Sequence, residues 1–244
     1  MRMKKLRAVG IIPARFASTR FSGKLLANLA GRPVLEWAYR SAKKSKAFEK
    51  IIIATDDPRI LRAAANFGAE AVMTGFEHSS GTDRIADVAR RINCDVVVNL
   101  QGDHPFVTPP MVRSLLAPFA DKKVEVATLA YPEKGEEKLK NPNSVKVVFD
   151  KNKLAMYFSR SIIPWEAEEA FVHIGLYAFR KKFLLTLVQK EPTSLENKEK
   201  LEQLRILENG TPIKVVLAKE AVPSIDVPED IAAAAAWAEK RGWI

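Results

Sequence analysis

The chain has 244 residues, 47% of them hydrophobic and 28% charged, and a formal net charge of +10 at pH 7. A chain of this length can bury one large core, or one core and a small lobe. It contains no apolar run of about eighteen residues, so no transmembrane helix is expected. Cys94 is the only cysteine, which excludes an internal disulfide and a cysteine-cluster metal site and indicates a reducing compartment.

The positive charge favours an anionic partner, such as a nucleotide, an acidic sugar, a nucleic acid or a membrane surface. The basic residues are spread along the chain, with only short clusters such as Lys43-Lys44 and Arg180-Lys181-Lys182. A nucleic-acid-binding protein more often has a dense basic patch interleaved with aromatic residues. We therefore expect no nucleic-acid or membrane partner. The short apolar stretch after the basic N-terminus predicts a first strand rather than a signal peptide.

In the first half of the chain, runs of Ile and Val alternate with segments of helical periodicity. The predicted strands are Ala8–Pro13, Ile51–Thr55, Ala71–Thr74 and Asp95–Gln101. The predicted helices are Val34–Ala47, a helix beginning after Asp57-Pro58 and covering Ile60–Phe67 with Gly68 as its C-cap, and Thr82–Arg91. Nearly continuous Ile and Val strands suit a parallel sheet that is buried on both faces. The order predicts a doubly wound α/β fold with a mostly parallel central sheet.

The second half has a different pattern, with fewer helices between the strands. Its predicted strands are Val124–Ala130, Val145–Phe149, Phe171–Phe179 and Ile213–Ala218. Its predicted helices are Lys181–Lys190, Lys198–Glu208 and a last helix that begins at Pro228 and includes Ala232–Ala236. No repeat or clear linker separates the halves. We therefore expect a single domain over residues 1–244, with an inserted α+β lobe at about residues 124–210.

The segment Pro13–Lys24 follows the first strand and carries three cations, Arg15, Arg20 and Lys24, among small and hydroxyl residues. The N–H groups of such a loop can surround phosphate oxygens, and Arg and Lys neutralise the phosphate charge. The spacing matches neither GxxxxGK[ST] nor GxGxxG. The alternative is a solvated basic loop, and residue types alone do not decide between the two.

Two acidic segments are candidate metal sites. Asp103 follows the strand that ends at Gln101, and ligands of open α/β sheets bind at such strand ends. Its carboxylate suits Mg²⁺, whereas the alternative is a common Gly-Asp turn. Asp226 lies just before Pro228, so its simpler interpretation is the start of a helix, and a metal role is the less favoured one.

Two further segments, around residues 80–82 and 173–177, each have two possible interpretations. Ser80 or Thr82 is interpreted as the N-cap of the following helix, with a loop that reads a base edge as the alternative. On an alternating strand, His173, Gly175 and Tyr177 share one face, which suits either the floor of a sugar site or a satisfied core histidine. His78 and His104 lie in loops and receive no catalytic role.

Taken in order, these segments resemble the 3-deoxy-D-manno-octulosonate (KDO) cytidylyltransferases, also called CMP-KDO synthetases. The resemblance runs from residue 11 to residue 230. Its segments are IIPARFASTRFSGK, IIIATDD, SSGTDR, NLQGDHP, NPNSVKVV, YFSRSIIPW, HIGLYAF, LEQLR and IDVPED. The family implies a Rossmann-like nucleotidyltransferase fold with a small lobe for sugar binding and dimerisation. It implies Mg²⁺-dependent transfer of CMP from CTP to the anomeric hydroxyl of KDO, with release of pyrophosphate, in cytoplasmic lipopolysaccharide biosynthesis by a homodimer.

The resemblance also assigns roles to residues. Arg15 and Lys24 would hold the phosphates of CTP, and Asp103 and Asp226 would hold Mg²⁺; these four are the catalytic candidates, and Arg20 has a weaker claim to a direct contact. The remaining nucleotide-binding candidates would be Ala14, Ala54, Thr55, Ser80, Gly81 and Thr82. The sugar-binding candidates would be Gln101, Arg160, His173, Tyr177, Glu202 and Gln203, with Arg160 facing the sugar carboxylate.

The sequence departs from the family's pattern at several places. His104 stands where Glu is usual, Ser22 where Pro is common, and Val227 where Thr is usual, and the segment between Trp165 and His173 is short. Three alternatives therefore stay open. The sugar is KDO, its 8-amino-8-deoxy form or a sialic acid, or the chain is a non-catalytic nucleotide- or RNA-binding protein. A pure phosphate or RNA binder would have little need of two metal-binding carboxylates.

Overall fold

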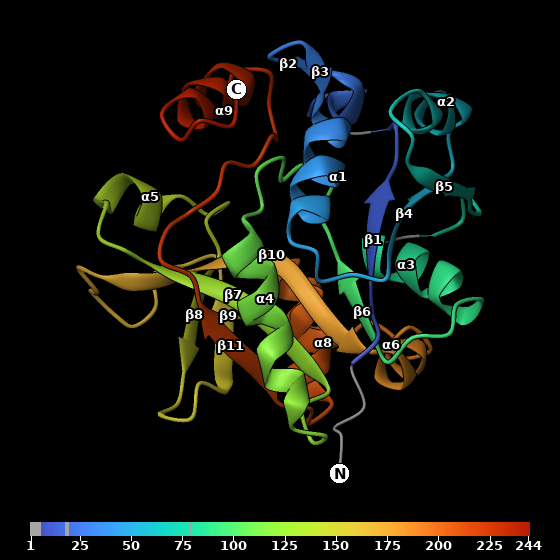
Figure 1. Cartoon of the computed structure of the whole chain (residues 1–244). Helices are drawn as coiled ribbons and strands as arrows, with labels where there is room; N and C mark the ends of the chain where they lie inside the picture. Colours follow the sequence, from blue (N-terminus) through green and yellow to red (C-terminus); the bar gives the residue numbers. More distant parts are fainter. Residues whose placement is uncertain (1–5, 18–19, 79) are drawn as a thin grey trace. The chain divides into compact units, whose positions relative to one another are not determined.

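The computed structural model describes residues 6–17, 20–78 and 80–244 (Figure 1). Ser18 and Thr19 of the basic loop, and Ser79 of the SSGTDR segment, lie outside the described residues. The chain divides into two compact units, one formed by the residues up to Arg113 together with Val222–Ile244, and one formed by Ser114–Ala221. Within the described ranges, no helix has the length and apolar character needed to cross a membrane.

The first unit contains four parallel strands in the order β6-β1-β4-β5 (Figure 1). They are β1 (Ala8–Ala14), β4 (Lys50–Thr55), β5 (Glu70–Met73) and β6 (Val96–Asn99). Ile11, Ile12 and Ile53 are completely buried, as are the three valines of β6. This is the burial that a central parallel sheet requires, and it explains why these segments are almost purely Ile and Val.

The helices of this unit begin at residues that their sequences specify. They are α1 (Val34–Lys44), α2 (Pro58–Asn66), α3 (Gly81–Arg90) and α9 (Asp230–Glu239). Asp57 caps α2 by accepting a hydrogen bond of 2.8 Å from the Arg59 N–H, and Pro58 occupies the first turn, where its missing N–H costs nothing. The helix α4 (Pro109–Leu116) includes the boundary at Arg113, and the 3₁₀ turn η2 (Ala117–Ala120) belongs to the second unit; neither was predicted.

The strand order creates a crevice at one place in this sheet. The chain moves outward from β1 to β4 and β5, and then returns through α3 to β6 on the other side of β1. Connections that leave two neighbouring strands in opposite directions open a crevice at the carboxyl ends of those strands. The segments that leave β1 and β6 are the two that carry Arg15 to Lys24 and Gln101 to Asp103. The fold therefore brings both candidate segments to the same edge.

The second unit is built around an antiparallel pair of strands, β7 (Val126–Glu133) and β10 (Ala170–Arg180). On its other side, β7 pairs in parallel with β11 (Ile213–Leu217). The strand β8 (Lys146–Phe149) pairs with β10 and with β9 (Ala155–Ser159). Its helices are the short α5 (Glu136–Lys140), α6 (Lys181–Leu187), α7 (Ser194–Glu199) and α8 (Gln203–Glu208).

The prediction of one helix over Lys198–Glu208 is wrong. Lys200 has a φ of 55°, in the left-handed region, and ends α7 before α8 begins. The Arg160 guanidinium stabilises this break, because its Nε donates to the Glu199 carbonyl (2.7 Å) and its Nη2 to the Lys200 carbonyl (3.2 Å). Carbonyls at the end of a helix need such partners. Other elements that were not predicted are α5, β9 and the hairpin of β2 (Asn28–Leu29) and β3 (Arg32–Pro33).

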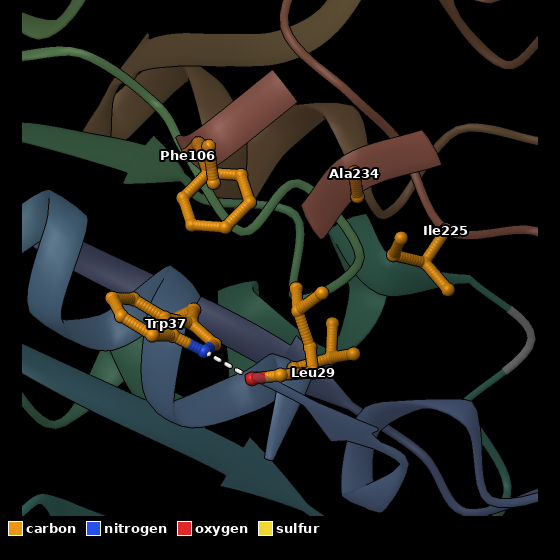
Figure 2. Packing of buried hydrophobic residues seen from close by; sticks show 7 residues of the cluster. Leu29, Trp37, Phe106, Ile225 and Ala234 are labelled. Carbon is orange, nitrogen blue, oxygen red and sulfur yellow. Dashed lines mark hydrogen bonds between the residues drawn. The ribbon is translucent and has the colours of Figure 1, made fainter. Parts of the chain in front are cut away.

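An apolar cluster of the first unit, called here the Phe106 cluster, joins segments that are far apart in the chain (Figure 2). Its buried members are Leu29, Val34, Trp37, Phe106, Ile225, Ala234 and Ala238. The rings of Trp37 and Trp237 lie 5.5 Å and 5.7 Å from that of Phe106. The Trp37 indole donates a buried hydrogen bond of 2.7 Å to the Leu29 carbonyl. The cluster thereby ties the β2–β3 hairpin, α1, the segment after β6 and α9 into one core.

Trp37→Phe should lower the free energy of unfolding by about 1–3 kcal/mol, because it removes a buried hydrogen bond and part of the indole volume. The same substitution at Trp165, whose side chain is 86% exposed, is the matched control and should have little effect. Urea unfolding, followed by far-UV circular dichroism, measures both. Equal unfolding midpoints for the two variants would contradict the structural role of the Trp37 bond.

Candidate functional site

A cavity of about 300 Å³ lies in the first unit, at the carboxyl ends of β1 and β6. It collects residues from the basic loop, from the start of α3, from the segment after β6 and from the segment before α9. Its lining residues are Pro13, Ala14, Arg15, Ala17, Arg20, Lys24, Leu25, His78, Ser80, Gly81, Arg84, Gln101, Gly102, Asp103 and Asp226. The four segments that carry the candidate residues therefore line one cavity.

The basic loop folds back on itself so that Lys24 enters the cavity. Gly23 has a φ of 71°, which only glycine adopts without strain, and its N–H donates to the Phe16 carbonyl at 3.0 Å. A short 3₁₀ turn, η1 (Lys24–Leu26), follows at once. Leu25 is buried, so the backbone of Lys24 is anchored while its side chain remains in the cavity.

Two carboxylates share the Lys24 ammonium. Its Nζ lies 2.6 Å from Asp103 Oδ2 and 3.3 Å from Asp226 Oδ1. Arg20, whose claim to a direct contact with CTP is the weaker one, also contacts Asp226, with 2.8 Å between Nη2 and Oδ1. Arg15 lines the cavity, is exposed and makes no ion pair with any described residue. The cavity thus holds two acids that lie close together and the three cations of the basic loop.

The backbone fixes the two carboxylates relative to each other. The N–H of Ile225, next to Asp226, donates to the Asp103 carbonyl at 2.9 Å. The Asp230 carboxylate then accepts from the N–H groups of Asp226 (2.7 Å) and Val227 (2.9 Å). The predicted start of the last helix at Pro228 is early by two residues, because Pro228 and Glu229 form the turn that leads into α9. This turn serves to aim Asp226 into the cavity.

Opposing influences set the charge of Asp103. Its burial alone would raise its pKa, but attraction to His104 and Lys24 and the hydrogen bond from Lys24 lower the pKa below the usual 3.8. Asp103 is therefore ionised at neutral pH, as a carboxyl group that binds a metal ion must be. Among the described residues, no group of three or more His, Cys, Asp or Glu side chains is placed to hold a metal. A metal here would have two protein carboxylates and would need further ligands from elsewhere.

The start of α3 faces the cavity. Ser80 is its N-cap: the Ser80 Oγ accepts from the Asp83 N–H at 3.1 Å, and the Asp83 carboxylate accepts from the Ser80 N–H at 3.2 Å. The N-cap interpretation is confirmed for Ser80. The first helical residue is Gly81, where a Cβ would come within 3.3 Å of the Pro13 ring. Glycine thus lets the positive end of α3 approach the basic loop closely.

Arg84 lines the cavity but was not among the candidate residues. Its side chain is only 4% exposed and forms an ion pair of 2.6 Å with Asp56, after β4. It also donates to the Thr74 hydroxyl at 2.5 Å and to the Gly75 carbonyl at 3.2 Å, after β5. A signal was present in the sequence, because an arginine on the apolar face of a predicted helix requires a buried partner.

Three predicted nucleotide-binding residues do not line the cavity. Ala54 and Thr55 are completely buried at the end of β4, beside Pro13 and Ala14 of β1. The Thr55 hydroxyl accepts from the Asp57 N–H at 3.1 Å and so helps to begin α2. Thr82 is 5% exposed within α3. The other nucleotide candidates, Ala14, Arg15, Lys24, Ser80 and Gly81, do line it, as does the sugar candidate Gln101.

The other sugar candidates lie in the second unit, where β10 carries a bulge. The register with β7 shifts between Ile174 and Tyr177, and the Thr128 hydroxyl fills the gap. This hydroxyl donates to the Leu176 carbonyl at 2.7 Å and lies 2.9 Å from His173 Nε2. The rings of His173 and Tyr177 are 5.2 Å apart, so these two residues do share a face, although the strand is not regular.

Several buried polar atoms of the second unit have no hydrogen-bond partner in the described part of the chain. Among them are the Tyr177 hydroxyl and Gln203 Nε2, which belong to predicted sugar-binding residues. Burial, and to a lesser degree the charge of Glu202, raises the pKa of Tyr177 well above 10 although the nearby Thr128 hydroxyl lowers it, so the phenol is protonated and able to donate. Buried polar atoms without partners are uncommon in proteins and cost free energy. A ligand hydroxyl or carboxylate would satisfy them.

Arg160, which was expected to face the sugar carboxylate, is bonded mainly to the backbone of its own unit. Its guanidinium donates to three backbone carbonyls, those of Pro142 (3.0 Å), Glu199 and Lys200. A guanidinium has five N–H donors, so two remain for a ligand carboxylate. The backbone N–H of Arg160 is held by the Glu199 carboxylate at 3.0 Å. Arg160 therefore holds α7 in place and retains a limited capacity for an anion.

Comparison with known proteins identifies the family. The cytidylyltransferase family model matches residues 9–219. A 3-deoxy-manno-octulosonate cytidylyltransferase of Synechococcus elongatus is 44% identical over 243 residues, which cover 97% of this chain and 100% of that protein. An enzyme of the same name from Bdellovibrio bacteriovorus is 45% identical over 237 residues, with 93% and 96% covered.

Solved structures agree with this assignment. The structure of CMP:2-keto-3-deoxy-manno-octonic acid synthetase complexed with CTP matches with a TM-score of 0.91 at 35% identity, covering 96% of this chain and 99% of that one. The 4-diphosphocytidyl-2C-methyl-D-erythritol synthase of Anaerococcus prevotii, at 16% identity and a TM-score of 0.66, shares the fold alone. The doubly wound, mostly parallel α/β nucleotidyltransferase fold predicted from the sequence is confirmed. The chain belongs to the cytidylyltransferase family.

Proposed function

We propose that this protein transfers CMP from CTP to the anomeric hydroxyl of KDO, giving CMP-KDO and pyrophosphate. The observation that carries the proposal is the joint contact of Lys24 with Asp103 and Asp226 inside a cavity that also receives Arg15 and Arg20. The two acids and the three cations of the basic loop together suit a metal-bound triphosphate. The relatives named above, similar over nearly their whole length, supply the sugar in the proposal.

The chain's own residues act by position and charge. The sugar hydroxyl releases its proton to water and forms a bond to the α-phosphorus of CTP, while the bond from that phosphorus to the pyrophosphate oxygen breaks and pyrophosphate leaves. Lys24 and Arg15 neutralise the negative charge that collects on the α-phosphate and the leaving pyrophosphate, as cations at a transferring phosphoryl group do. The N-terminal end of α3, at Gly81, adds a partial positive charge at the same edge, whereas the Ser80 N–H is already bonded to the Asp83 carboxylate. The reaction needs no protein nucleophile.

The residues at the cavity fit Mg²⁺. Asp103 and Asp226 would hold the ion, and it would act as a Lewis acid that polarises the α-phosphate when bound. Mg²⁺ is commonly bound by one or two carboxylates together with substrate phosphates, which agrees with a site of two protein carboxylates. The lowered pKa of Asp103 keeps one of these ligands ionised.

The proposal assigns sugar affinity to Gln101 in the first unit and to His173, Tyr177, Glu202 and Gln203 in the second. The partnerless hydroxyl of Tyr177 and amide of Gln203 support it, because a sugar acid offers the acceptors that they lack. Arg160 is included through its two remaining N–H donors. Homodimer formation, a cytoplasmic location and a role in lipopolysaccharide biosynthesis belong to the same proposal through the family resemblance.

The direct test is a pyrophosphate-release assay with CTP and Mg²⁺ and three acceptors: KDO, 8-amino-8-deoxy-KDO and sialic acid. KDO should give the largest kcat/KM, and UTP in place of CTP should give little product. Release with the amino sugar but not with KDO would replace the sugar in the proposal. Binding of RNA without Mg²⁺, and no release with any sugar, would favour a non-catalytic protein instead.

Asp103→Asn should lower kcat by about 10²-fold or more, because the amide carries no charge and is a poorer metal ligand. The protein should stay folded, since the amide keeps the shape of the side chain and the Ile225 backbone bond is unaffected. Asp121→Asn, at an exposed turn, is the matched control and should keep normal turnover. Near-normal turnover of Asp103→Asn would remove Asp103 from the catalytic residues.

Tyr177→Phe should raise the KM for KDO about tenfold, which corresponds to one lost hydrogen bond of about 1.4 kcal/mol. The KM for CTP should not change. The free energy of unfolding should stay the same or rise, because the substitution removes a buried hydroxyl that has no partner in the described residues.

Tyr157→Phe, in the same unit, is the matched control, and its KM for KDO should remain normal. If Tyr177→Phe loses stability while its KM for KDO is unchanged, the Tyr177 hydroxyl has a structural role and no part in sugar binding.

A further inference from the structure

The position between Asp103 and Asp226 is filled by a cation of the chain itself. The Lys24 ammonium lies within 2.6 Å and 3.3 Å of the two carboxylates, and its side chain is only 15% exposed. Arg20 adds a second positive charge at Asp226. Within this group of four side chains, two positive charges balance two negative ones. A free divalent cation would therefore meet an already neutralised pair of carboxylates.

The arrangement is built into the backbone. Asp103 and Asp226 are joined through the Ile225 N–H bond, and the Asp230 carboxylate fixes the Asp226 backbone. Leu25, next to Lys24, packs so close to Gly102 that a Cβ there would lie 3.2 Å from a Leu25 methyl group. The attachment points of the lysine and both acids are thus held independently of any bound cation. The long, flexible side chains of Lys24 and Arg20 can readily move their charges, and of the two Lys24 is the one that contacts both acids.

The Lys24 ammonium and a divalent metal ion compete for the two carboxylates. The ammonium and a metal ion need the same carboxylate oxygens, and like charges at such short range repel strongly. In the part of the chain that the structure describes, no third His, Cys, Asp or Glu side chain is placed to compensate. The phosphates of a nucleotide change both conditions: they offer Lys24 and Arg20 new anionic partners, and they supply oxygen ligands for the metal.

We infer that Lys24 occupies the cation position of the free protein, and that a divalent metal binds well only when a nucleoside triphosphate draws the ammonium away. Metal and nucleotide then bind with positive coupling, and each raises the affinity for the other by the same factor. The inference rests on the proposed use of a nucleotide but concerns binding alone. Lys24 thereby has two roles: it binds phosphate when the nucleotide is present, and it competes with free metal for the two carboxylates when the nucleotide is absent.

The test is a titration of the free protein with Mn²⁺, followed by electron paramagnetic resonance, with no nucleotide or sugar present. Lys24→Met should bind Mn²⁺ at least about tenfold more tightly than the unmodified protein, a ratio in the range of ordinary coupling factors. Lys50→Met is the matched control, because Lys50 is paired with Glu70 at an exposed position away from the cavity. It should bind Mn²⁺ as the unmodified protein does.

Two further variants make the outcome decisive. Adding Asp103→Asn to Lys24→Met should abolish the gain in Mn²⁺ affinity, which places the ion at the carboxylates. Lys24→Gln should reproduce the gain and replaces Lys24→Met if that variant does not fold.

Equal Mn²⁺ affinity of the unmodified protein and the folded Lys24 variants would overturn the inference. The unmodified enzyme's pyrophosphate release with CTP and KDO tests the proposed function separately, so the two failures are distinguishable.

Discussion

The hydrogen bond from the Ile225 N–H to the Asp103 carbonyl is the constraint on which the site depends. It joins the segment after β6 to the segment before α9, which are more than a hundred residues apart in sequence. The Phe106 cluster holds both ends of this hydrogen bond in place, since Phe106 follows Asp103 closely in the sequence and Ile225 itself belongs to the cluster. Apolar burial thus does the positioning, and the carboxylates need not attract a metal in order to come together. Positioning by the core is needed because two nearby carboxylates repel each other and would not come together by their own charges.

The sequence predicted most of the first unit, because its strands and caps are specified locally. Continuous Ile and Val identify buried parallel strands, and Asp57-Pro58 and Ser80 identify helix starts without help from the rest of the chain. The strand-end position of Asp103 followed from the same rules. Asp226 was undervalued from residue types alone, since its importance arises from a backbone bond to a distant segment. The family resemblance, and not its spacing, paired it with Asp103.

The second unit was harder to predict for a physical reason. Its helix break at Lys200 depends on Arg160, whose guanidinium reaches the end of α7 from the end of β9, and no local sequence rule contains that contact. The bulge in β10 similarly depends on the Thr128 hydroxyl from another strand. The strand β9 was missed because it is short and carries an apolar residue on its exposed face: Met156, its second residue, is 66% exposed, so the sequence does not alternate between apolar and polar residues. Arg84 illustrates the same limit, because its partners come from two loops that only the fold brings together.

The capping box at the start of α3 determines what that helix can offer to a ligand. The Ser80 hydroxyl and the Asp83 carboxylate are committed to each other's backbone N–H groups, so their side chains close the helix end. Gly81 follows this cap and lines the cavity, and the absence of a side chain lets the first turn of α3 pass close to the Pro13 ring. The cap could therefore change from one hydroxyl–acid pair to another without altering this approach, whereas any other residue in place of Gly81 would crowd Pro13.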